Sequence, residues 1–180
     1  MAVSAWCESL LLSNRERRST IKLVMRKKST DWPNILGKLT ANVDGFEESD
    51  PGCNDDEIAE VEEHLGRSLP ESVAAVLRVS DGARLHLRHQ VIHLASRTQL
   101  EAWHEEGAIE DLGAFPFAHD GDDHLLVLDT DGEWGGARGT VYRLQLSQRF
   151  IHGRLIHGAL PLSKSMRGLF SMVMKGSDLW

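Results

Sequence analysis

The sequence predicts one α+β domain, with helices segregated to one side or end of an antiparallel sheet. A length of 180 residues suits a single domain. Along the chain, amphipathic helices come first, then strands with one inserted helix, then a final helix. The strands follow one another as hairpins do, which favours antiparallel pairing. We assign residues 31–180 to this domain and residues 1–30 to a basic N-terminal extension, either helical or partly disordered.

The first helix of the domain is predicted to follow Asp31, a residue type that caps helix N-termini. Apolar side chains then recur at i, i+3, i+4 and i+7, which is the spacing of one buried helix face. These residues are Trp32, Ile35, Leu36 and Leu39. Residues 41–53 are predicted to form a loop, because glycine, proline and acidic residues interrupt the apolar pattern.

Two further helices are predicted to form a helical hairpin. Residues 54–57 (Asn-Asp-Asp-Glu) have the spacing of a capping box, in which each end residue bonds the backbone N–H of the other. Gly66 suits a left-handed cap at the end of that helix. Residues 68–71 (Ser-Leu-Pro-Glu) repeat the capping-box spacing, and Asp81 and Gly82 end the second helix.

The remaining elements are mostly strands. Alternating or continuous apolar runs predict strands at residues 84–89, 91–94, 115–118, 124–129 and 140–146, with a further candidate at 150–156. Pro116 indicates a sheet edge or a strand start. Ser96 and Gln99 give a third capping box for a helix through Trp103, and Ser163 is predicted to cap the last helix.

The net charge of -7 is unevenly distributed along the chain. Residues 44–63 carry 10 acidic side chains and residues 101–133 carry 11, with no lysine or arginine in either block. Overall acidity argues against nonspecific nucleic-acid binding, which needs a basic surface. Helix starts account for much of the first block, because the helix dipole favours anions there. The second block lies on turns between strands, where it is free to meet a partner.

Composition also excludes membrane-spanning and secreted classes. No apolar run approaches the roughly 18 residues of a membrane span. The N-terminus has an acidic residue where a signal peptide has basic ones. The two cysteines, Cys7 and Cys53, form no CxxC motif and suit a reducing compartment. These features predict a cytoplasmic protein.

Sequence motifs for catalysis or cofactor binding are absent, including GxSxG, Walker, Rossmann and HExxH patterns. Residues 119–124 (His-Asp-Gly-Asp-Asp-His) are the densest set of potential metal ligands, but a solvated Asp-Gly turn explains the same residues. His86, His89 and His93 would place two histidines on one face of a continuous strand, with no third ligand evident. We expect no catalytic residue, no cofactor and no metal, and keep a metal-dependent enzyme using the 119–124 cluster as a remote alternative.

The middle of the chain carries an ordered series of short motifs. They are Pro51-Gly52, Glu57-Ile58, Glu62, Leu65-Gly66, Leu69-Pro70 and Asp81-Gly82. Together they resemble the signature of the SUKH superfamily, which includes the yeast cell-wall-assembly regulator and many bacterial proteins. Weaker matches follow at residues 96–103, at 115–129 and in the last helix, so the resemblance covers about residues 32–174. It implies a single domain with a mixed, mostly antiparallel sheet.

The resemblance also implies a function. Bacterial SUKH members are regarded as immunity proteins that neutralise toxins, commonly nucleases, and eukaryotic members resemble protein-interaction modules. We therefore expect a non-enzymatic module that binds a protein partner, most concretely a basic nuclease toxin, without direct binding to nucleic acid or membrane. A regulatory or scaffold protein with an endogenous partner is the alternative, and the oligomeric state stays open.

The second acidic block supplies the candidate contacts for such a partner. An acidic surface can cover the basic, phosphate-binding face of a nuclease, and complementary charge speeds the encounter. We expect Trp134 to be exposed, because it lies in a polar loop, and we expect Trp32 and Trp103 in the core. The candidate partner-binding residues are Asp120, Asp122, Asp123, Asp129, Asp131, Glu133 and Trp134. The alternative is that these acids only keep the surface soluble.

Overall fold

The computed structural model describes residues 31–42, 46–48, 50–87, 89–106, 114–145, 159–177 and 179. Apart from Asp31, these residues fall in one compact unit, Trp32–Trp180. The predicted basic extension and the candidate strand at residues 150–156 lie outside the described residues. None of the helices in the described ranges is both long and apolar enough to cross a membrane.

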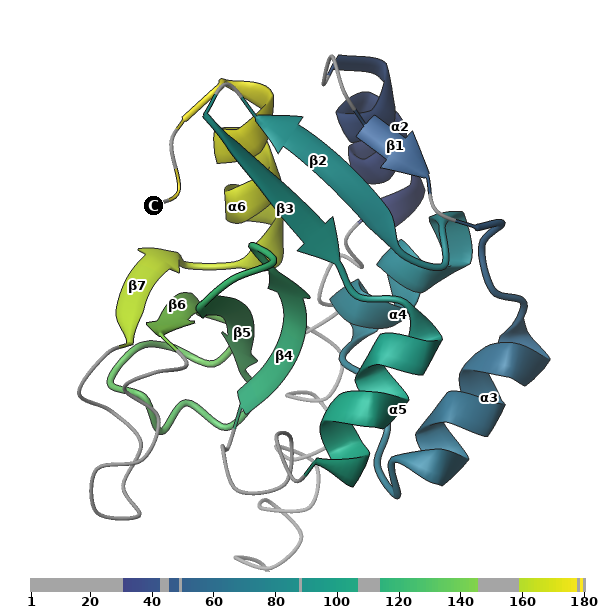
Figure 1. Cartoon of the computed structure of the whole chain (residues 1–180). Coiled ribbons are helices and arrows are strands. Elements are labelled where there is room, and N and C mark those ends of the chain that lie inside the picture. The colour runs from purple at the N-terminus through teal and green to yellow at the C-terminus, as the bar shows by residue number, and fades with distance from the viewer. Residues whose placement is uncertain are drawn as a thin grey trace, which may run out of the picture. The chain divides into compact units, whose positions relative to one another are not determined.

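Seven strands of the described residues form one sheet (Figure 1). They are β1 (Phe46–Glu48), β2 (Ala83–Leu87), β3 (Gln90–Leu94), β4 (Ala114–His119), β5 (His124–Asp129), β6 (Val141–Gln145) and β7 (Leu160–Ser163). Their order in the sheet is their order in the chain, and each neighbouring pair is antiparallel. The predicted α+β class and the hairpin succession are therefore confirmed.

The described residues also form five helices. They are α2 (Trp32–Asn42), α3 (Asp55–His64), α4 (Glu71–Val79), α5 (Arg97–Glu105) and α6 (Met166–Met174). α2 contacts α4 and α6, and α3 contacts both α4 and α5, with α3 and α5 side by side in Figure 1. The helical hairpin predicted for α3 and α4 is thus present.

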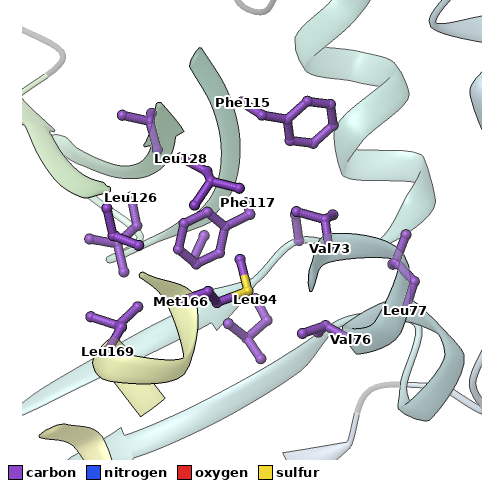
Figure 2. Close-up of a cluster of buried hydrophobic side chains, with 14 of the residues drawn as sticks. Val73, Val76, Leu77, Leu94, Phe115, Phe117, Leu126, Leu128, Met166 and Leu169 are labelled. Carbon is purple, nitrogen blue, oxygen red and sulfur yellow. The ribbon is translucent and has the colours of Figure 1, made fainter. Parts of the chain in front are cut away.

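The hydrophobic core lies between the sheet and α4 and α6. Figure 2 shows apolar side chains of both helices directed at β3, β4 and β5. The labelled residues are Val73, Val76, Leu77, Leu94, Phe115, Phe117, Leu126, Leu128, Met166 and Leu169. In α2, three of the four predicted core residues are buried, namely Trp32, Leu36 and Leu39, and Ile35 is half-buried. The predicted helix spacing therefore identifies the face that packs inward.

The predicted start of α4, with Ser68 as its cap, is two residues too early. Pro70 is the N-cap, its backbone is extended (φ -55°, ψ 136°), and no side chain caps the helix. Leu69 precedes this proline, and steric clash with a proline ring disfavours helical backbone in the preceding residue. Ser68 therefore cannot begin the helix. The N–H of Leu69 instead donates to Glu62 Oε1 at 2.7 Å.

The strands differ from the prediction at the two sheet edges. β1 lies inside the predicted loop 41–53, and β7 has no predicted counterpart. β1 has three residues and β7 has four, so both are too short to show the alternation of apolar and polar residues that predicts a strand. Because Ser163 ends β7, the cap of α6 is Ser165, whose hydroxyl accepts the Gly168 N–H at 3.1 Å. Pro116 lies in an internal strand, beside a β-bulge and outside the stretch paired with β3, where its missing N–H is tolerated.

Candidate functional site

The acidic segment 119–134 is divided by β5. The β4–β5 turn, residues 120–123, precedes this strand, and the β5–β6 loop, residues 130–140, follows it. The two acidic segments therefore lie at opposite ends of a strand of six residues, a separation of about 20 Å at roughly 3.3 Å per residue. Carboxylates that are close in the sequence do not form one continuous cluster.

The β4–β5 turn is organised by Asp120. Its Oδ1 accepts the N–H groups of Asp122 and His124 at 2.9 and 3.1 Å, and its Oδ2 lies 2.7 Å from His124 Nδ1. Burial raises the pKa of Asp120, but these hydrogen bonds outweigh burial and leave the pKa below its usual value. Asp123 is half-buried and accepts from Gln145 Nε2 at 2.8 Å. Asp122 is the exposed carboxylate of this turn.

The β5–β6 loop folds around the carboxylate of Asp129. This side chain is 0% exposed and accepts the N–H groups of Asp131, Gly132 and Trp134 at 3.2, 2.6 and 3.2 Å. Trp134 is also buried, at 8% exposure, and Tyr142 Oη donates to its carbonyl oxygen at 3.0 Å.

The expectation of an exposed Trp134 is therefore wrong, because the loop closes over a buried carboxylate that the polar sequence does not reveal. Asp129 likewise presents no carboxylate to a partner, since backbone N–H groups of its own loop occupy both oxygens. Asp131 and Glu133 remain exposed. Trp32 and Trp103 are in the core as predicted, each at 8% exposure.

A histidine pair joins β3 to the end of β4. His93 and His119 are opposite each other in the ladder, and their rings stack with centroids 4.9 Å apart and 16° between planes. The Trp103 ring of α5 meets His119 edge-on at 5.9 Å. The sequence pattern groups His93 with His86 and His89, but the chain turns between β2 and β3, so the partner of His93 comes from a distant strand. Only the sheet register brings this pair together.

A polar depression of about 180 Å³ borders the histidine pair. Besides the two histidines, Arg84, Ser96 and Gln99 contribute to its lining. Within the residues that the structure describes, no three His, Cys, Asp or Glu side chains converge as metal ligands. The chemistry available here is hydrogen bonding and proton exchange at imidazole.

The motif residues of segment 51–82 hold helix ends together. Glu57 accepts the Asn54 N–H at 2.9 Å, which completes the predicted capping box, and accepts from Arg97 Nη1 at 2.8 Å. Arg97 also reaches Asp81, from Nε at 3.1 Å and from its backbone N–H at 2.7 Å. The hydrogen bond from the Asn54 N–H lowers the pKa of Glu57, and Arg97 lowers this pKa by a smaller amount. These side chains tie the starts of α3 and α5 to the end of α4, so their role is architectural.

The first acidic block forms a separate acidic surface on α3. Its outward side chains include Asp56, Glu60 and Glu63, all exposed. Asp55 forms an ion pair with Arg78 at 2.9 Å. This surface comes from a helix with no lysine or arginine, and it gives an internal standard against which the two acidic loops can be tested.

Comparison with known proteins agrees with the architecture of the motif segment. A family model described as the SMI1 / KNR4 family (SUKH-1) matches residues 52–157, which is more than half of the chain. No curated protein sequence matches the chain. The matched range begins at the Pro-Gly motif before α3 and includes both acidic loops and the histidine pair. The chain therefore belongs to the SMI1 / KNR4 family (SUKH-1).

Proposed function

We propose that this domain is a non-enzymatic protein-binding module, specifically an immunity protein that neutralises a basic, nuclease-type toxin. Domains of this family are in general non-enzymatic immunity or regulatory domains, which supplies the functional class. The observation that carries the choice of surface is the exposure of Asp122, Asp131 and Glu133. Within the described ranges no ion pair involves these three carboxylates, so their charge is available to a partner.

The distance between the two acidic loops is compatible with one interface. A standard interface covers roughly 800 Å² on each partner, a patch about 30 Å across. The separation of about 20 Å along β5 fits within that patch. A basic partner that spans β5 would therefore meet carboxylates near both edges of the contact. Close charge pairs across such interfaces couple by roughly 1.5–7 kcal/mol when desolvated.

The neighbourhood of the gene gives the first test. An immunity role predicts an adjacent reading frame for a large secreted protein with a variable C-terminal toxin domain. Co-expression of the full chain with that toxin domain is expected to restore the growth of a host that the toxin domain alone kills. The absence of any such neighbour, or no protection on co-expression, would contradict the immunity role and favour a regulator that binds an endogenous partner.

Two sets of charge reversals test the surface. The loop variant D122K/E133K/D131K reverses the three exposed loop carboxylates. The helix variant E60K/E63K/E106K reverses three exposed carboxylates of α3 and of the residue after α5, and changes the net charge equally. We expect the loop variant to lose protection while it retains its fold by circular dichroism, and the helix variant to protect. Equal loss in both variants would mean that net charge, rather than this surface, governs binding.

A further inference from the structure

One hydrogen bond of the β4–β5 turn depends on the protonation state of His119. The backbone N–H of Gly121 donates to His119 Nδ1 at 3.0 Å. A backbone amide can only donate, so Nδ1 carries the lone pair and the proton of the neutral ring resides on Nε2. In imidazolium both ring nitrogens are donors, and this hydrogen bond is then lost.

We propose that His119 is a proton switch for Gly121 in the β4–β5 turn: the neutral ring accepts the Gly121 N–H next to Asp122, and protonation at Nδ1 breaks that bond while the hydrogen bonds of Asp120 remain. Three geometric features act together. The ring is half-buried, its Nδ1 accepts the Gly121 N–H, and it stacks on a second histidine, His93, so that two protonated rings would repel at 4.9 Å. Gly121 itself has φ 89°, a backbone conformation that favours glycine and keeps this turn narrow.

Charged and titratable groups face His119 from several elements. β3 supplies His93, β2 supplies Arg84, and Asp50 and Asp81 line the same depression from the segments around α3 and α4, whereas α5 contributes the uncharged side chains Trp103 and Gln99. On its own turn are Asp120 and His124. Arg84 lies 3.6 Å from Glu47, and Asp81 is bonded to Arg97, so both have other partners.

The direction of the pKa shift of His119 agrees with the geometry. Burial and then the charge of His93 lower the pKa of His119, while Asp120 acts in the opposite direction. With a folded pKa below the unfolded value of 6.5, the unfolded chain binds more protons in the interval between the two values. The contribution of His119 to stability is therefore complete above about pH 6.5 and falls as the pH decreases through the folded pKa.

The test uses His119→Asn in the full chain, because the Asn Oδ1 can accept the Gly121 N–H but the side chain does not titrate. The matched control is His89→Asn, at an exposed histidine in the β2–β3 turn. Urea unfolding of all three proteins is measured between pH 8 and pH 5, and the Gly121 amide is followed by NMR. The wild type and His89→Asn are expected to lose stability on acidification, with the Gly121 resonance moving in step with the His119 ring.

The two readouts separate the possible outcomes. In His119→Asn we expect the loss on acidification to shrink and the Gly121 resonance to stay fixed. If the equilibrium constant for unfolding changes between pH 8 and pH 5 by the same factor, within about twofold, in the wild type and in His119→Asn, the proposal is wrong. If His119→Asn does not fold, the wild-type titration decides: a His119 ring that titrates without moving Gly121 overturns the switch. The proposal does not depend on the proposed immunity function.

Discussion

Asp129 gives the sharpest prediction about stability. In Asp129→Ala, the N–H groups of Asp131, Gly132 and Trp134 lose a shared acceptor that is 0% exposed. A hydrogen bond to a charged group contributes about 1.5–3 kcal/mol, but bonds that share one carboxylate are not additive, and the N–H groups of the outer loop can reach water after relaxation. We therefore expect a loss of about 3–5 kcal/mol, or roughly 10 °C in Tm for a chain of this size.

The variant Asp129→Asn is expected to lose only part of this stability. The amide oxygen can keep the two bonds of Oδ1, whereas its NH₂ group would face the Trp134 N–H, so the expected loss is about 1.5–3 kcal/mol. Urea unfolding gives the free energies. Asp131→Ala, at an exposed carboxylate, is the control and should change stability by no more than about 0.5 kcal/mol. A stability of Asp129→Ala within about 1 kcal/mol of wild type would refute the role of this carboxylate.

Three further predictions concern other parts of the domain. A Cβ at Gly52 would collide with backbone atoms at the end of α4, so Gly52→Ala should destabilise the fold strongly. A Cβ at Gly37, on α2, would lie in open space, so Gly37→Ala should stabilise the fold by about 0.5–1 kcal/mol in the same urea assay. Arg97→Ala should destabilise the fold, since its side chain bonds both Glu57 and Asp81, and Arg97→Lys should recover less than half of that loss because lysine cannot bridge two carboxylates with a planar fork. Burial raises the pKa of the Cys53 thiol to about 11 from 9.0, so in a variant with Cys7 replaced by serine the native protein should react with a disulfide reagent at pH 8 about 100-fold more slowly than the unfolded chain. Equal rates in the native and unfolded chains would contradict this burial.

Helix starts that depend on neighbouring residues are predictable from the sequence. The Asn54–Glu57 capping box and the left-handed Gly66 follow from local chemistry, and the structure contains both. Ser68 and Ser163 show the limit of the same reasoning. Each has cap-like spacing, but a proline at position 70 and pairing of β7 with β6 move the helix starts to later residues.

The candidate site depends on contacts that local patterns do not encode. The sequence places most of these acids on turns, but it does not show that Asp129 belongs to β5, that this strand separates the others, or that a loop closes over Asp129. Stacking of His93 on His119 depends on the register between β3 and β4. The exposed set that remains, Asp122 with Asp131 and Glu133, could be selected only after the fold was known.

The central claim is that these exposed loop carboxylates bind a basic protein partner. The most direct test is calorimetric titration of the full chain with the toxin domain that the proposed function predicts in an adjacent reading frame, at low and at physiological salt. We predict a complex whose Kd rises at least about tenfold in the variant D122K/D131K/E133K, equivalent to about 1.4 kcal/mol, and changes little in E60K/E63K/E106K. The affinity should also weaken as salt increases. A Kd that is the same for the wild type and the loop variant would contradict the claim.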